Sequence, residues 1–316
     1  MKRISAMTTI LASILFLSCP TAAWSEEVPR QSAAPQKSAQ KSVGKALEPR
    51  IVSFPWRPQT GPAAAYRLEE AADQHKVIIF PGAEKKGSPV LLGFHGQPKR
   101  GKNPRDYQFA PTVISVVRQM IADKEIPPVI LVLPVFRFVG QNWPGFDIAA
   151  FKAQMESIFA THGVSPGDWY LFGHSGAAGC GGDGLNQAHV VAPKAVGFFD
   201  TCLGTGWQQE VEALRTAKIH TVNLHSVETA GFRPKQRPEY QSAFDFGRAW
   251  GPLGIRPVEC PNNLPEAPLR KQPYRCAATE NGTIEGYVVD TGEGVEAHQK
   301  LLPTALRYFL RRFVSR

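Results

Sequence analysis

Residues 172–180 read FGHSGAAGC and place a single serine, Ser175, among glycines and alanines. Such small side chains pack a core poorly, so their concentration here indicates that the backbone adopts an unusual conformation that larger side chains would prevent. A serine at a sharp turn from a strand to a helix needs small residues two positions before and two after it, because larger side chains would collide. Gly173 and Ala177 occupy these positions. The stretch therefore predicts a turn that presents the Ser175 hydroxyl as a nucleophile.

Two other glycine-rich motifs fit this stretch less well. A dinucleotide-binding loop has the spacing G-x-G-x-x-G, whereas Gly173, Gly176 and Gly179 follow G-x-x-G-x-x-G. A phosphate-binding loop requires G-K-[ST], which this stretch does not contain. The pattern is G-x-S-x-G with alanine in the last place, directly after the apolar run WYLFG. Its position after a predicted strand favours a nucleophile over a chance match.

The chain on both sides of this turn alternates between apolar runs and amphipathic segments. The apolar runs are short, rich in β-branched residues and continuous, which is typical of strands buried on both faces of a parallel sheet. They cover 76–80, 89–94, 128–135, 169–173, 195–200, 220–226 and 286–290. Helical patterns cover 110–123, 146–163, 206–218 and 298–316. This alternation predicts an α/β fold with a doubly wound, mainly parallel sheet, in which ligands bind beyond the carboxyl ends of the strands.

Residues 229–275 break the alternation with many prolines and few periodic patterns. We expect an irregular insertion before the last strand, because long irregular stretches inside a compact domain are uncommon and are often functional. Two interpretations stay open: an active-site lid, and a surface loop with no role in substrate choice.

A nucleophilic serine needs a general base, which the chain can draw from eight histidines. His298 follows the last predicted strand by the short loop TGEGVEAH, which places it at the same sheet edge as Ser175. His174, inside the turn, and His225, within a predicted strand, are interpreted as packed side chains. His95, in FHG after an earlier strand, is interpreted as shaping its loop. We therefore expect His298 to be the base.

An acid must orient this base, and two candidates follow neighbouring predicted strands. Asp200 ends the run AVGFFD, and Glu228 follows the next run, HTVNLHS. Asp200 is preferred because it is the last residue of a clean strand and its short side chain suits the reach. Glu228 stays the alternative.

The developing oxyanion needs backbone N–H donors close to the serine. The N–H of Gly176, directly after Ser175, is the first expected donor. The second is the N–H of Gln97, in the loop after PVLLGFHG, where Gly96 lets the backbone approach.

With these residues in place, 76–316 resembles the α/β-hydrolase family. GFHGQ is similar to the family's oxyanion loop, GHSGA to its nucleophile turn, and FFD and HQKLLP to the regions of its acid and base. The chain order Ser, Asp, His also agrees, and alanine at position 177 is a mild departure. The resemblance implies a cofactor-free serine hydrolase that cleaves an ester, thioester or amide through an acyl-enzyme. The substrate does not follow from the fold.

The N-terminal segment is predicted to be removed. Lys2 and Arg3 precede an apolar stretch too short to span a bilayer, so residues 1–25 are interpreted as a signal peptide that is cleaved after Ser25. Acylation of Cys19, as in a lipoprotein, is the less favoured alternative. Residues 26–49 lack aromatics and are rich in Ser, Ala, Gln, Lys and Pro, which predicts a flexible linker before a catalytic domain at 50–316. The expected location is periplasmic or secreted, with no integral membrane span.

Four of the five cysteines stay in the predicted mature chain. An even number of cysteines in an oxidising compartment indicates disulfides, and the shortest loops favour Cys180–Cys202 and Cys260–Cys276. No CxxC or His-rich spacing indicates a metal site, so no metal is expected. No cofactor is expected either, because the resemblance implies a cofactor-free hydrolase.

The formal net charge of +9 indicates contact with an anionic cell envelope, or only a solvated surface, because an exported protein rarely meets nucleic acid. Three functions are compatible with the sequence. The first is an exported esterase, and the second is an amidase or peptidase that acts on peptidoglycan-like envelope material. The third, a non-catalytic binding protein, is disfavoured by the three candidate triad residues. The expected partner is a small-molecule or cell-envelope substrate.

Overall fold

The structure is a computed structural model. It describes residues 48–54, 75–96, 109–134, 143, 145–178, 183–201, 205–226, 251–260, 275–289, 291–292 and 294–315. All of these residues belong to one compact unit, Val43–Arg316. The predicted signal peptide, 1–25, lies outside the described residues, as does the predicted linker apart from Glu48 and Pro49.

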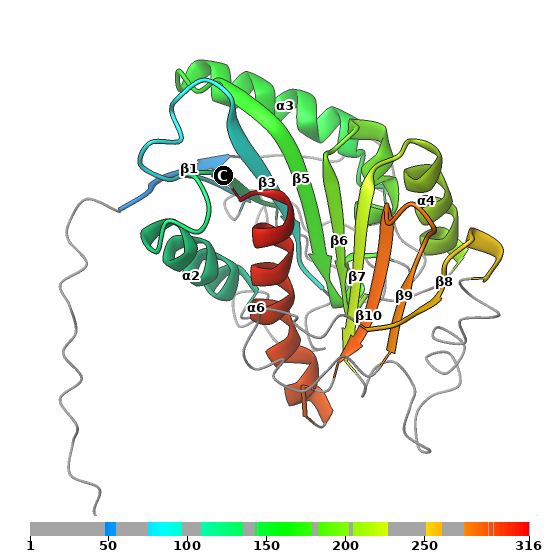
Figure 1. Cartoon of the computed structure of the whole chain (residues 1–316). Helices are drawn as coiled ribbons and strands as arrows, with labels where there is room; N and C mark the ends of the chain where they lie inside the picture. The colour runs from blue at the N-terminus through cyan, green and yellow to red at the C-terminus, as the bar shows by residue number, and fades with distance from the viewer. Residues whose placement is uncertain are drawn as a thin grey trace, which may run out of the picture. The chain divides into compact units, whose positions relative to one another are not determined.

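The described residues contain a ten-stranded sheet in the order β1-β2-β4-β3-β5-β6-β7-β10-β9-β8 (Figure 1). The strands are β1 Arg50–Phe54, β2 His75–Ile79, β3 Ser88–Phe94, β4 Ile130–Leu133, β5 Pro166–His174, β6 Ala195–Phe199, β7 His220–Ser226, β8 Arg256–Val258, β9 Arg275–Ala278 and β10 Ile284–Val289. The strands from β4 to β10 in this order run parallel, whereas β1, β2, β9 and β8 each pair antiparallel. This doubly wound, mainly parallel sheet is the α/β-hydrolase fold that the sequence predicts.

Helices cover both faces of this sheet. One face packs against α3 (Ile148–Thr161) and α4 (Thr205–Thr216), and the other against α2 (Phe109–Ala122) and α6 (Gly294–Phe313) (Figure 1). The Asp147 side chain caps α3 by accepting a hydrogen bond from the Ala150 N–H at 2.9 Å.

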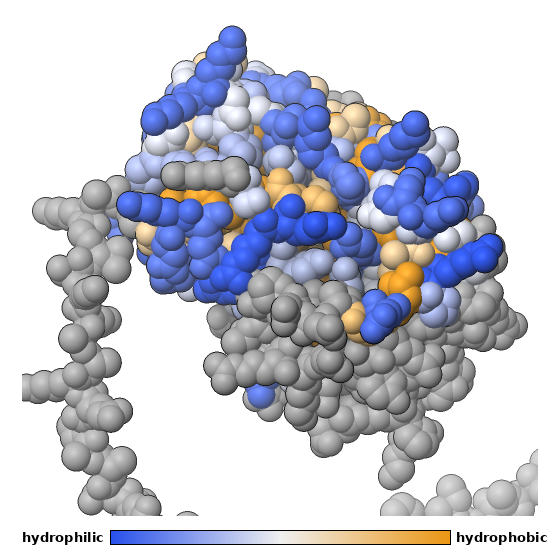
Figure 2. Space-filling model, viewed as in Figure 1, coloured by the Kyte–Doolittle hydropathy of each residue, from blue (hydrophilic) through white to orange (hydrophobic). Residues whose placement is uncertain are grey.

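Two hydrophobic cores result, one on each face. Along β3, Val90 and Leu92 pack into the core beneath α3, while Leu91 between them packs into the core beneath α2 and α6. This explains why the strands read as continuous apolar runs. Leu301, Ala305 and Phe309 follow the helical spacing along the buried face of α6. The face drawn in Figure 2 is hydrophilic over most of its described area, with smaller hydrophobic patches.

Three strands were not expected from the sequence. β1 and β8 are the two end strands and are mostly exposed, and β9 lies next to β8. Their sequences RIVSF, RPV and RCAA form no long apolar run. β8 falls inside the insertion predicted at 229–275, together with a short 3₁₀ segment at Gly251–Leu253. The described part of that insertion is therefore not wholly irregular, because it extends the sheet.

A disulfide joins Cys260, just after β8, to Cys276 in β9. This pair agrees with one of the two predicted pairings. Cys180 and Cys202 lie outside the described residues. Among the helices that the structure describes, none is long and apolar enough to cross a membrane.

Candidate active site

The turn after β5 is built as tightly as its sequence requires. Ser175 is half-buried and has a φ of +60°, in the left-handed region that residues other than glycine rarely adopt. A Cβ atom added to Gly173 would lie 2.5 Å from Ala177 Cβ and 3.0 Å from Leu185 Cδ2. A larger residue at position 173 would therefore displace the turn. The chain then continues in short 3₁₀ segments, Ser175–Ala177 and Gly184–Val191.

The register of three parallel strands brings the candidate residues to one edge of the sheet. In the pairing, His174 at the end of β5 lies opposite Phe199 of β6, and Phe199 lies opposite Leu224 of β7. Ser175 and Asp200, each directly after its strand, therefore emerge next to one another at the carboxyl edge.

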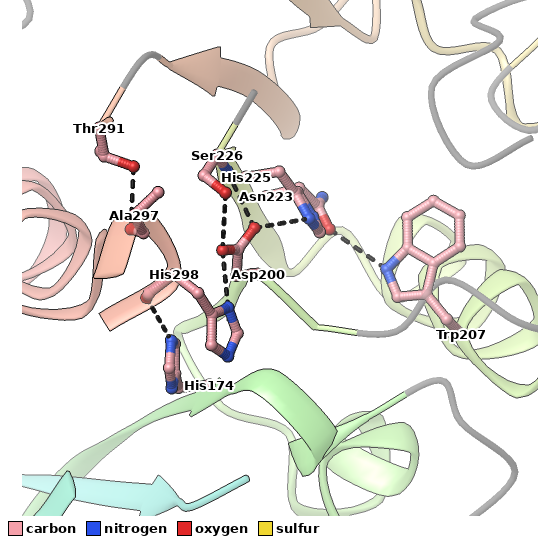
Figure 3. A network of polar contacts seen from close by, with 9 residues as sticks. All are labelled: His174, Asp200, Trp207, Asn223, His225, Ser226, Thr291, Ala297 and His298. Atoms are coloured by element: carbon pink, nitrogen blue, oxygen red, sulfur yellow. Dashed lines mark hydrogen bonds and ion pairs between the residues drawn. The ribbon is translucent and has the colours of Figure 1, made fainter. Parts of the chain in front are cut away.

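The structure places His298 beside Asp200. His298 lies in the first turns of α6, which begins at residue 294, earlier than the sequence predicted. Its Nδ1 atom is 2.8 Å from Asp200 Oδ2 (Figure 3). Because an ionised carboxylate only accepts hydrogen bonds, Nδ1 carries the proton in this pair and Nε2 keeps its lone pair. That lone pair is what a general base needs.

Asp200 is held firmly in this pair. Its side chain is buried, and its φ of +49° turns the chain sharply at the end of β6. The N–H of Ser226 donates to Oδ1 at 2.8 Å, and the Ser226 hydroxyl donates to Oδ2 at 3.0 Å (Figure 3). These hydrogen bonds favour the charged carboxylate. Ser226 was not predicted from the sequence, where its only signal is its place at the end of the next strand.

Two further histidines surround the pair. The His174 ring stacks on the His298 ring with centroids 4.3 Å apart, and His225 Nδ1 lies 3.8 Å from Asp200 Oδ1. Burial lowers the pKa of His174 to about 3 and that of His225 to about 4. Both are therefore neutral near pH 7. Both histidines were predicted to be packed side chains, and their contacts with the pair were not predicted.

The loop after β3 passes directly against Ser175. A Cβ atom added to Gly96 would overlap Ser175 Cβ and would lie 2.9 Å from Ser175 Oγ. Only glycine fits here without a shift. The Trp143 indole N–H donates to the His95 carbonyl at 2.9 Å, and burial lowers the pKa of His95 to about 4.

Of the two expected oxyanion donors, the structure describes only Gly176. Gly176 is buried directly after Ser175, while Gln97 lies outside the described residues, as does the alternative acid, Glu228. Within the described ranges, no group of three or more His, Cys, Asp or Glu side chains is arranged to hold a metal ion.

No family profile matches the chain, and no curated protein matches it in sequence. Several solved structures resemble it. A ferulic acid esterase has a TM-score of 0.45 and 15% identity, covering 83% of this chain and 99% of its own. The feruloyl esterase module of Clostridium thermocellum, complexed with sinapinate, has a TM-score of 0.42 and 14% identity, covering 83% and 88%. An esterase domain from a Rhodothermus marinus protein has a TM-score of 0.39 and 12% identity, covering 84% and 100%.

Proposed function

We propose that this chain is a serine hydrolase that cleaves carboxylic esters through an acyl-enzyme. Ser175 is the nucleophile, His298 the general base and Asp200 the acid that orients it. The observation that carries the proposal is the hydrogen bond of 2.8 Å between His298 Nδ1 and Asp200 Oδ2. The His298 ring also stacks on His174, the residue directly before Ser175. Ser175 itself has the left-handed φ of +60° that a sharp nucleophile turn needs.

The first half of the reaction forms the acyl-enzyme. Ser175 Oγ attacks the ester carbonyl carbon while His298 Nε2 takes the hydroxyl proton, and Asp200 stabilises the imidazolium that results. The carbon–oxygen bond to the alcohol then breaks, and the same proton passes from Nε2 to the departing alkoxide oxygen.

The second half releases the acid. Water attacks the acyl carbon as Nε2 takes one of its protons, and the bond to Ser175 Oγ breaks. The proton on Nε2 then returns to Oγ. In both tetrahedral intermediates the negative oxygen is stabilised by the N–H groups of Gly176 and Gln97. Removing one such donor typically costs about 10²–10³ in rate.

The proposed enzyme works outside the cytoplasm, in the periplasm or in the medium. The signal peptide predicted at 1–25 supports export. The disulfide between Cys260 and Cys276 adds support, because disulfides persist mainly in oxidising compartments.

A fluorophosphonate probe tests the nucleophile. The wild-type protein is expected to be labelled on Ser175, and Ser175→Ala is expected to lose both the label and several orders of magnitude in kcat while keeping its circular dichroism spectrum. Full labelling of the alanine variant would overturn the assignment of the site. An unlabelled wild-type protein would instead favour a binding protein on this fold.

The bond that is cleaved is tested separately. Hydrolysis of p-nitrophenyl acyl esters of increasing chain length is compared with the release of peptides from purified cell wall. We expect Ser175-dependent ester hydrolysis. Release of envelope peptides without ester turnover would make the protein an amidase or peptidase.

A further inference from the structure

The residue directly before the proposed nucleophile contacts the proposed base twice. His174 Nε2 donates a hydrogen bond to the main-chain carbonyl of His298 at 3.0 Å. The two rings also stack, with centroids 4.3 Å apart and an interplanar angle of 28° (Figure 3). His174 ends β5 and is only 2% exposed, so it belongs to the rigid sheet. The contact joins β5 to α6 across 124 residues of sequence.

These two contacts restrain what the carboxylate leaves unrestrained. The hydrogen bond from His298 Nδ1 to Asp200 fixes one edge of the base ring but permits the ring to rotate about that bond. A ring stacked against its face blocks this rotation. The hydrogen bond to the His298 carbonyl also holds the main chain from which the base extends. The His298 ring is thereby restrained beside the end of β5, which Ser175 directly follows.

The two buried histidines beside His298 do not compete with it for a proton. Asp200, His174 and His225 are the described titratable groups that interact with it. Burial, and secondly repulsion by a protonated His298, lowers the pKa of His174 to about 3, and burial lowers that of His225 to about 4. The His298 side chain is 21% exposed. A proton taken from Ser175 therefore stays on His298.

We propose that His174 is a positioning residue for the reaction. As a neutral ring with its hydrogen on Nε2, it fixes the main chain and ring plane of His298, and it offers an aromatic face to the imidazolium that forms when His298 takes the Ser175 proton. Cations are attracted to aromatic faces. The inference rests on the proposed function, because it assigns His174 a role toward His298 as the base.

The wild-type protein supplies the first test. Side-chain ¹⁵N NMR is recorded between about pH 5 and 8, where an ordinary histidine titrates. We expect His174 to stay neutral with its hydrogen on Nε2 throughout. A hydrogen on Nδ1 of His174, or titration of His174 in this range, would overturn the proposal without the need for any variant.

Two variants separate the two contacts. His174→Phe keeps a ring but loses the donor, and His174→Gln keeps an amide donor near the position of Nε2 but loses the ring. Each is expected to lower kcat by about 10-fold to 100-fold, because misplacing a catalytic group by about 1 Å can cost that much. KM is expected to change little. The acid limb of the kcat/KM profile is expected to move to lower pH in His174→Gln alone, because the stacked ring favours the imidazolium.

Thr221→Val is the matched control. Thr221 is buried near the opposite end of β7 from Ser226, and its hydroxyl also donates to a main-chain carbonyl, that of Ile219 at 3.2 Å. The control loses a comparable hydrogen bond but is expected to keep the kcat and pH profile of the wild type. If wild-type protein hydrolyses esters through Ser175 and both His174 variants behave like Thr221→Val, His174 only packs and the inference fails. If the wild type lacks this hydrolysis, the proposed function fails.

Discussion

Asp200 illustrates how much one side chain must do at this site. Its carboxylate lies within hydrogen-bonding distance of His298 Nδ1, the Ser226 N–H and the Ser226 hydroxyl, at 2.8, 2.8 and 3.0 Å. All three groups donate, so the site is arranged for an acceptor with a full negative charge. An amide in the same place would offer a donor to at least one of them.

Asp200→Asn therefore tests the acid. The amide leaves His298 poorly oriented and favours the wrong tautomer, so we expect kcat to fall by a factor that approaches about 10⁴. Glu228→Gln is expected to cost far less. Steady-state kinetics on both variants makes the comparison, after circular dichroism shows that each is folded, because a lost buried hydrogen bond can destabilise by about 1–3 kcal/mol. An inactive, folded Glu228→Gln beside an active Asp200→Asn would move the acid to position 228.

The loop after β3 and the segment before α3 support one another beside the turn at Ser175. Trp143 is 2% exposed, packs edge-on against Phe94 with centroids 5.0 Å apart, and donates its indole N–H to the His95 carbonyl at 2.9 Å. A Cβ atom added to Gly184 would lie 2.8 Å from Trp143 Cβ. The tryptophan thus lies between the loop that is proposed to bind the oxyanion and the segment that follows the nucleophile.

Trp143→Phe is expected to impair the oxyanion loop. It keeps most of the packing but leaves the His95 carbonyl without the indole donor. We expect kcat to fall by about tenfold with little change in KM, which is less than the loss of a whole oxyanion donor would cost.

Trp207→Phe is the control for this change. Trp207 in α4 is also buried, and its indole N–H donates to Asn223 Oδ1 at 3.2 Å. An equal loss of kcat in both variants would mean that Trp143 acts only through stability.

Buried neutral histidines make the stability of the domain depend on pH. Burial lowers the pKa of His75, His95 and His225 to about 4 each and that of His174 to about 3, whereas an unfolded chain protonates histidine below about pH 6.5. The unfolded state therefore binds more protons between these values. The contribution of each histidine to the free energy of unfolding is fully present above about pH 6.5. It is lost as the pH falls toward the folded-state pKa, with a slope of up to about 1.4 kcal/mol per pH unit for each histidine.

Glu210 acts in the opposite direction. Burial raises its pKa to about 7, so its contribution is largest at low pH and is lost as the pH rises toward 7. Because four histidines oppose this one carboxyl group, we expect a net loss of stability from pH 7 to pH 4. Urea unfolding at several pH values measures it. A midpoint that stays constant or rises on acidification would contradict these assignments.

The disulfide closes the edge of the sheet that the insertion extends. It links Cys260 to Cys276 across a separation of 16 residues, and Cys276 is buried against the core beneath α6. Replacing both cysteines by serine is expected to lower the free energy of unfolding by about 3 kcal/mol, as estimated for loops of this length.

Peptide mapping without reduction checks both predicted pairings. It is expected to find Cys260 joined to Cys276 and Cys180 joined to Cys202. Free thiols in protein recovered from the periplasm would contradict the pairing and the proposed compartment.

The sequence alone was sufficient to predict the central strands and the turn at Ser175. In β3, Ser88–Phe94, the residues from Val90 onward are apolar or glycine and are buried, and that continuous run is visible without a structure. The small residues around Ser175 are likewise a local steric requirement between close neighbours in the chain. By contrast, β1 and β8 are exposed end strands, and β9 beside β8 has only four residues. All three are joined to the sheet by main-chain pairing, which leaves little trace in the side chains.

The tertiary structure decided which side chains meet. Two acids followed neighbouring predicted strands, and spacing along the chain could not choose between them. The fold places Asp200 beside His298, 98 residues away, and places the ring of His174 on the same histidine. Such contacts depend on the register of parallel strands and on where α6 packs. Both are set by the burial of two hydrophobic cores formed from residues far apart in the sequence, and no local pattern records them.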